Sequence, residues 1–164
     1  MEDSVDLIIS QWAKARPDLD VSAMGILGRL SRLTRHLERE QQHLFSKHQL
    51  QPGEFDILAT LLRADTEHRG LTVGQLTASV MVTGGAVTNR LDRLAGKGLI
   101  TRTTDPHNRR TIRISLTAAG REVIDAALLD HVFNEERLLV TLTYSERQIL
   151  EGLLRTMLSE HESR

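Results

Sequence analysis

The spacing of hydrophobic residues predicts a mostly helical chain. Apolar side chains recur every three or four residues through most of the sequence, which is typical of helices with one buried face. Pro52 suits a first helical turn, and Asp20 or Ser22 could cap the helix before it. The predicted helices are 3–15, about 22–47, 52–65, 73–80, 84–96, 118–142 and 143–161.

Between residues 99 and 117 the hydrophobic period changes from 3.6 to 2. The segments "LITRTTD" and "TIRISLT" are predicted to be strands, and "PHNRR" between them forms the basic tip of a β-hairpin. Leu71 and Val73 could add a very short strand. The order helix, short strand, helix, turn, helix, hairpin predicts a winged helix-turn-helix, a mostly α fold with a small β-hairpin wing.

Composition places the chain among ordinary globular proteins. It has 164 residues, of which 40% are hydrophobic and 26% charged, with no cysteine and no apolar run of eighteen residues. The first residues are acidic and amphipathic, unlike a secretory signal, so we expect a cytoplasmic protein. We expect three parts: N-terminal helices over 1–50, a DNA-binding lobe over 51–117, and C-terminal helices over 118–164.

Positive charge is concentrated in one segment. The whole chain carries a formal charge of −1, but residues 83–113 hold seven basic and two acidic side chains, a charge of +5. The other residues therefore carry −6. A local basic patch on an acidic body suits a protein that binds a polyanion, although a solvated basic surface would have the same composition.

The predicted helix over 84–96 has the size of a recognition helix for the DNA major groove, and the hairpin tip would reach the adjacent minor groove or backbone. We expect its positive groups and those of the tip to point outward in the same direction. The candidate DNA-binding residues are Thr83, Gly84, Gly85, Ala86, Thr88, Asn89, Arg90, Arg93, His107, Asn108, Arg109 and Arg110.

Catalytic and metal-binding patterns do not support an enzyme. The sequence has no phosphate-binding loop, no nucleophile elbow, no zinc-protease motif and no dinucleotide fingerprint. Its seven histidines include no pair four residues apart, which disfavours a zinc site, so we expect neither a metal nor a cofactor.

The segments "LTVGQL" and "GGAVTNRLDRLAGKGLITRTTDPHNRRTIRISLTAAG" resemble the MarR family of bacterial transcription regulators. The most specific part is the wing pattern D-P-x-x-R-R followed by L-T-x-x-G. The resemblance implies a homodimer with interlocking N- and C-terminal helices, a pseudo-palindromic operator, and repression relieved by a small anionic or phenolic ligand. The wide apolar faces of the end helices independently favour a dimer, with folding back within one chain as the alternative.

Within the wing, Asp105 resembles the family acid that pairs with an arginine of the hairpin tip, either Arg109 or Arg110. That pair would hold the hairpin, and the other arginine would contact DNA.

Four further residues, Trp12, Asp56, Arg63 and Arg90, together resemble the urate-responsive, PecS-like subgroup of this family. The resemblance implies that the tryptophan lines an effector pocket, that the arginines meet the charge of a urate-like or polycarboxylate anion, and that the aspartate senses it by repulsion. The alternative is an Asp56–Arg63 ion pair, an Arg90 that contacts DNA and a tryptophan that anchors the core. The sequence therefore predicts a ligand-responsive repressor, with a constitutive DNA-binding protein as the alternative.

Overall fold

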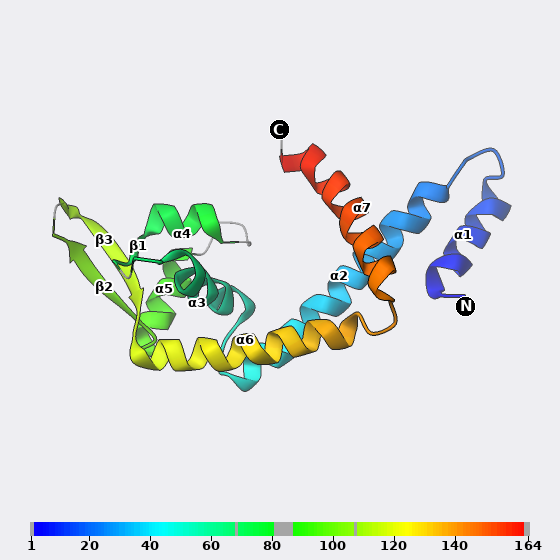
Figure 1. The fold of residues 1–164 in the computed structure, drawn as a ribbon. Helices are drawn as coiled ribbons and strands as arrows, with labels where there is room; N and C mark the ends of the chain where they lie inside the picture. Colours follow the sequence, from blue (N-terminus) through cyan, green and yellow to red (C-terminus); the bar gives the residue numbers. More distant parts are fainter. Residues whose placement is uncertain (1, 68, 81–86, 107, 163–164) are drawn as a thin grey trace. The chain divides into compact units, whose positions relative to one another are not determined.

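The computed structural model describes residues 2–67, 69–80, 87–106 and 108–162 (Figure 1). The chain forms two compact units, Met1–Pro52 and Gly53–Arg164. Each unit is described by itself below.

The first unit consists of two helices, α1 (Ser4–Ala15) and α2 (Ser22–Lys47). Asp3 caps α1, because its carboxylate accepts hydrogen bonds from the backbone N–H groups of Val5 and Asp6 at 2.7 and 3.2 Å. The Asp6 carboxylate accepts the Asp3 N–H in return, which completes a capping box. The predicted first helix is therefore confirmed, with its start fixed by two acidic side chains.

A glycine on α2 lets α1 approach closely. A Cβ added to Gly28 would lie 3.4 Å from Cγ1 of Val5, which is the buried residue of α1. At the same contact, the Arg29 guanidinium binds Asp3 at 2.8 Å and Asp6 at 2.5 Å. The cap of α1 thus also attaches this helix to α2.

Within its described residues, the second unit contains a small sheet and five helices. The strands are antiparallel in the order β1-β3-β2, and the hairpin β2–β3 forms the wing. Figure 1 shows the sheet, α3, α4 and α5 gathered around the N-terminal end of the long α6. The elements are α3 (Pro52–Ala64), β1 (Leu71–Thr72), α4 (Val73–Ser79), α5 (Val87–Gly96), β2 (Ile100–Asp105), β3 (Asn108–Leu116), α6 (Ala118–Leu138) and α7 (Tyr144–Glu162).

Aliphatic side chains from α3, α4, α5, β3 and α6 form the core of this unit. Burial of such groups supplies most of the free energy that stabilises a domain of this size. Those with almost no exposed surface are Ile57, Leu58, Leu76, Leu91, Leu94, Ile114 and Ile124.

The junction between the wing and α6 explains the L-T-x-x-G pattern. The Thr117 hydroxyl accepts the Gly120 N–H at 2.9 Å as the helix cap, and donates to the Gly98 carbonyl at 2.7 Å. A Cβ on Gly120 would clash with the backbone carbonyl of Leu99. Only glycine therefore lets the first turn of α6 rest directly on the start of the wing.

Two predicted boundaries differ from the structure, and a third cannot be compared with it. β3 begins at Asn108 rather than at Thr111, so residues 108–110 belong to the strand and not to a loop at the tip. α6 ends at Leu138 instead of 142. The predicted cap Thr83 lies outside the described residues, and the described part of α5 begins at Val87.

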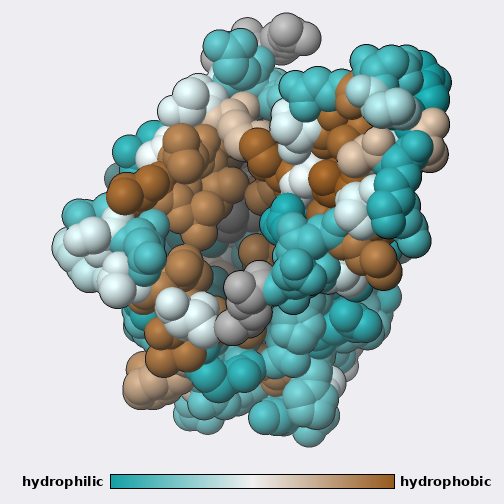
Figure 2. All heavy atoms as spheres, turned by 90° about the vertical axis from the view of Figure 1, so that its right-hand side faces the viewer, coloured by the Kyte–Doolittle hydropathy of each residue, from teal (hydrophilic) through white to brown (hydrophobic). Residues whose placement is uncertain are grey.

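Apolar side chains are exposed on both α6 and α7. On α6, Leu129 and Phe133 are 63% and 72% exposed, and on α7 Ile149 and Leu153 are 63% and 61% exposed. The brown surfaces in Figure 2 show that hydrophobic residues reach the solvent on the side it displays. Among the described residues, no helix is long and apolar enough to cross a membrane.

Candidate nucleic-acid interface

The recognition helix α5 has three faces with different roles. Val87, Leu91 and Leu94 are buried and fix the helix to the core. Thr88 and Asn89 are exposed, as the sequence predicted, and they offer hydrogen-bonding groups to a ligand outside the protein. The third face carries the basic residues and faces α3.

Glu54 in the first turn of α3 binds two of these basic residues. Its side chain is fully buried, and its two carboxylate oxygens lie 3.2 Å from Nε of Arg93 and 2.8 Å from Nζ of Lys97. A buried carboxylate is costly unless it is paired and hydrogen-bonded, so these contacts hold α5 against α3. The prediction that the α5 arginines all point outward is therefore wrong for Arg93, although its side chain remains half exposed.

Arg90 also turns toward the start of α3. A Cβ added to Gly53 would lie 2.5 Å from both Cζ and Nε of Arg90, so the guanidinium rests on the bare backbone of that glycine. Its Nη1 atom is buried and has no hydrogen-bond partner among the described residues. The outward direction predicted for Arg90 is thus also incorrect, because its guanidinium packs on α3.

In the wing, Asp105 pairs with Arg113 and not with a tip arginine. The Nε atom of Arg113 lies 2.5 Å from Oδ2 of the buried Asp105, and its Nη1 donates to the Gly70 carbonyl at 3.0 Å. The expectation that Arg109 or Arg110 makes this pair is therefore wrong. The reason lies in the sheet register: Arg113 faces Thr103, two residues before Asp105, which is within reach of a long side chain, and the register shifts between Thr104 and Asp105.

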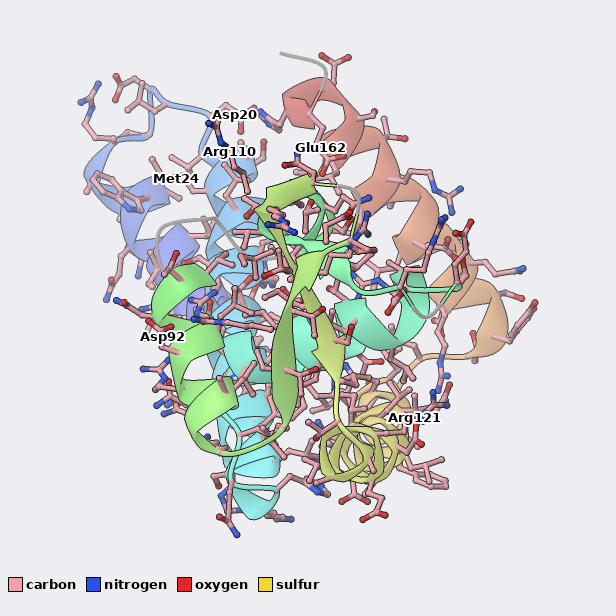
Figure 3. All side chains as sticks on the ribbon, turned by 90° about the vertical axis from the view of Figure 1, so that its left-hand side faces the viewer. Asp20, Met24, Asp92, Arg110, Arg121 and Glu162 are labelled. Atoms are coloured by element: carbon pink, nitrogen blue, oxygen red, sulfur yellow. The ribbon has the colours of Figure 1, made fainter. Side chains whose placement is uncertain are left out.

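Arg109 and Arg110 are both exposed, and neither side chain has a partner in the part of the chain that the structure describes. Figure 3 shows Arg110 near the outer end of the hairpin. The backbone N–H of Arg110 donates to the Asn108 side chain at 3.1 Å, which orders the strand at this point. The two arginines therefore have their guanidinium groups available for an anion.

Another ion pair of α5 connects this helix to the wing. Arg102 on β2 binds Asp92 on the outer side of α5 at 2.6 Å, and Figure 3 shows Asp92 pointing away from the helix. Four of the seven basic residues between 83 and 113 are thus paired with acids of the same lobe. They are Arg93, Lys97, Arg102 and Arg113.

Five candidate residues cannot be located. Thr83, Gly84, Gly85, Ala86 and His107 lie outside the described residues. Glu54 was not among the residues predicted for the site, although its spacing offered a signal. Glu54 lies on the same face as the buried Leu58 and Leu61, where a charged residue is unexpected unless it has a partner.

The candidate effector residues are spread over both units. Trp12 lies on α1 and is 41% exposed, so it is not a core anchor within the first unit. In the second unit, Asp56 is half-buried on α3, and Arg63 donates to the Ser79 carbonyl at the end of α4 at 2.7 Å. Arg63 is ten residues beyond Gly53, about 15 Å along α3. It therefore lies far from the Gly53 backbone against which the Arg90 guanidinium packs.

No cluster of three or more potential metal ligands occurs within the ranges that the structure covers.

A two-stranded wing with free arginines beside a core-anchored recognition helix defines the class of the protein, a winged-helix DNA-binding protein.

Comparison with known proteins gives the family. The profile of the MarR family matches residues 50–112. The HTH-type transcriptional regulator PecS of Dickeya dadantii is 37% identical over 147 residues, which are 90% of this chain and 88% of PecS. The HTH-type transcriptional repressor YetL of Bacillus subtilis is 28% identical and covers 75% of this chain and 72% of its own.

The solved structures agree. A mutant MarR from E. coli in complex with operator DNA has a TM-score of 0.71 and 26% identity, and covers 85% of this chain and 99% of its own. The chain belongs to the MarR family. It is a DNA-binding transcriptional regulator and not an enzyme.

Proposed function

We propose that the protein is a homodimeric repressor that binds a pseudo-palindromic operator and releases it when a small anion binds. In this proposal the helices within 1–50 and 118–164 form the dimer, and residues 51–117 bind DNA. The observation that carries the DNA-binding part is the pair of exposed arginines on the wing, Arg109 and Arg110, whose side chains have no partner among the described residues. YetL and MdtR, another B. subtilis relative, are both named as transcriptional repressors, which supports the direction of regulation.

The exposed apolar residues of α6 and α7 support the dimer. A monomer in water rarely leaves so many large apolar side chains exposed along two helices, and a second copy of the chain would bury them. Two identical lobes in one dimer would then match two half-sites about one turn of DNA apart.

Arg90 provides a route from effector binding to DNA release. Its guanidinium packs on Gly53 and has a buried nitrogen without a partner in the described part of the chain, so an anion that bound it would gain a strong charge-assisted hydrogen bond. Moving this side chain off Gly53 would shift α5 relative to α3. A ligand that prefers the shifted state would lower the affinity for the operator. Trp12, Asp56 and Arg63 are the other residues that we assign to the effector response. Arg63 acts at a distance from Arg90, because it lies about 15 Å along α3 from Gly53.

The test is an operator-binding titration in the presence of anions. Fluorescence anisotropy with labelled DNA from the intergenic region beside the gene would be measured with urate and with planar or polycarboxylate anions. We expect at least one anion to raise the dissociation constant of the operator complex. Operator DNA should weaken the binding of that anion by the same factor, because the coupling is reciprocal.

Two variants separate this proposal from a constitutive DNA-binding protein. Trp12→Phe and Arg63→Ala should abolish the anion response and leave operator affinity largely unchanged, while Arg121→Ala on α6 serves as the control. If no anion of the panel changed the operator affinity of the wild type, the constitutive DNA-binding protein would be favoured. A full dose response in both variants would remove these residues from the effector site.

A further inference from the structure

Three arginines on α2 have no acidic partner among the described residues. Arg32 and Arg39 make no hydrogen bond or ion pair there, and Nε of Arg35 donates only to the Ser31 carbonyl at 3.2 Å. The arginine one turn earlier differs, because Arg29 binds both Asp3 and Asp6. The three side chains are therefore a separate group of positive charges, which we call the α2 arginine face.

The α2 arginine face lines a hollow. Positions 32, 35 and 39 follow the i, i+3, i+7 spacing that places side chains on one side of a helix. Together with Glu38 they line a surface hollow of about 390 Å³. Three positive groups and one negative group give this hollow a formal charge of +2.

The three neighbouring positive charges of the α2 arginine face destabilise α2. Like charges three and four residues apart repel one another on a helix surface. Glu38 could relieve the repulsion, but it forms no ion pair with the arginines in the described part of the chain. An external anion would therefore lower the electrostatic energy of the helix as it bound.

We propose that the α2 arginine face is a binding site for a multivalent oxyanion, a small molecule with two or more phosphate or carboxylate groups. Guanidinium groups recognise such oxygens through paired, nearly planar hydrogen bonds, and three of them favour a ligand with several charges over a single one. The hollow has the volume of a small-molecule site. Because its walls are open to water, binding weakens as salt screens the charges.

The α2 arginine face shares no residue with the DNA-binding residues or the assigned effector residues. Trp12 lies on α1 in the same unit, but it does not line the hollow. The α2 arginine face belongs to the unit Met1–Pro52, whereas Arg90, Arg109 and Arg110 belong to the unit Gly53–Arg164. The experiment must still distinguish the α2 arginine face from the wing, because a basic wing also attracts polyanions.

The probe is inorganic tripolyphosphate, titrated into the full-length protein by calorimetry at constant ionic strength. The variant Arg32→Gln/Arg35→Gln/Arg39→Gln removes the charges of the face, and Gln preserves the helical preference of the chain. The matched control is Arg109→Gln/Arg110→Gln in the wing. We expect the α2 variant to bind tripolyphosphate at least tenfold more weakly than the wild type, and the wing variant to retain this binding.

Several outcomes would overturn the proposal. One is the absence of tripolyphosphate binding by the wild type, and another is equal affinity in the α2 variant. Loss of binding in the wing variant alone would place the anion on the DNA-binding lobe. A changed molecular mass of the α2 variant without added anion would identify a second copy of the chain as the occupant. If the triple variant lost helical content by circular dichroism, Arg39→Gln alone should still weaken binding severalfold.

Discussion

Glu54 stabilises the position of the recognition helix through a fully buried carboxylate. Glu54→Gln removes the charge but keeps the shape, so Arg93 and Lys97 lose their counter-ion. We expect a loss of roughly 1–2 kcal/mol in the free energy of unfolding, because charge-assisted hydrogen bonds are removed while both cations can still reach water. Chemical denaturation followed by circular dichroism measures this change.

The same variant tests whether Glu54 limits the interaction of α5 with DNA. With Arg93 and Lys97 freed, binding to random DNA should strengthen and its salt dependence should become steeper, while the preference for the operator falls. The control is Asp125→Asn, which removes one negative charge from an exposed pair with Arg121 on α6. If both variants changed DNA binding equally, only the total charge of the protein would matter.

The wing arginines should contribute affinity without much sequence preference. Arg109→Ala/Arg110→Ala removes two exposed guanidinium groups, so binding to operator and to random DNA should weaken together. The slope of log affinity against log salt should fall by about one for each DNA phosphate that the variant no longer neutralises. An unchanged slope in anisotropy titrations would exclude these arginines from the interface.

For single residues, the sequence showed where positive charge is concentrated, but not which of the charged side chains are paired. The concentration of arginine between residues 83 and 113 was visible at once, and the free pair at the wing agrees with it. The partner of Asp105 depended on strand register, and the partners of Glu54 depended on how α5 packs against α3. Neither arrangement can be derived from spacing along the chain.

Among the elements, α1 is attached to α2 by a small set of charged groups. The pKa of Asp6 lies below its ordinary value, because the backbone N–H of Asp3 and the Arg29 guanidinium both donate to its carboxylate. A depressed pKa in the folded state means that the contact stabilises above the ordinary value of 3.8 and disappears as the pH falls through the lowered one.

Arg29→Gln should loosen α1 and move this acid transition to higher pH. Trp12 on α1 is the single tryptophan of the chain, so its fluorescence reports on this helix. We expect the emission change of the variant to begin at higher pH than in the wild type, while far-UV circular dichroism tracks global unfolding. Arg16→Gln, which breaks an exposed pair with Asp18 outside the helix contact, is the control. Identical transitions in wild type and Arg29→Gln would show that this pair does not hold α1.

The helices and the wing could be predicted from the hydrophobic periodicity of the sequence. The exact ends of these elements depended on local contacts. The capping boxes at Asp3 and Thr72 and the cap at Thr117 carry recognisable side chains, and those helices begin within one residue of the predicted start. β3 starts earlier than predicted because residues 108–110 are all polar and give no alternating signal. Backbone pairing with β2, rather than side-chain pattern, extends that strand.

For the whole molecule, the exposed apolar faces of α6 and α7 predict that a single charge can disrupt the dimer. Leu153 is 61% exposed and lies on the apolar face of α7, so Leu153→Lys would place an ammonium group in the proposed interface. We expect light scattering after size-exclusion chromatography to show a shift toward monomer. Operator affinity should fall by about tenfold or more, because the two half-sites would no longer be bound by one linked unit.

Gln148→Lys is the matched control, because it adds the same charge to an exposed polar position of the same helix. Residues 148 and 153 are about 140° apart around a helix, so the control places its charge on a different face of α7. A monomer that results only from Leu153→Lys would assign dimerisation to the apolar face. If both variants remained dimeric and bound the operator with wild-type affinity, the exposed leucines of α7 would not form the contact, and other surfaces would have to pair the two lobes.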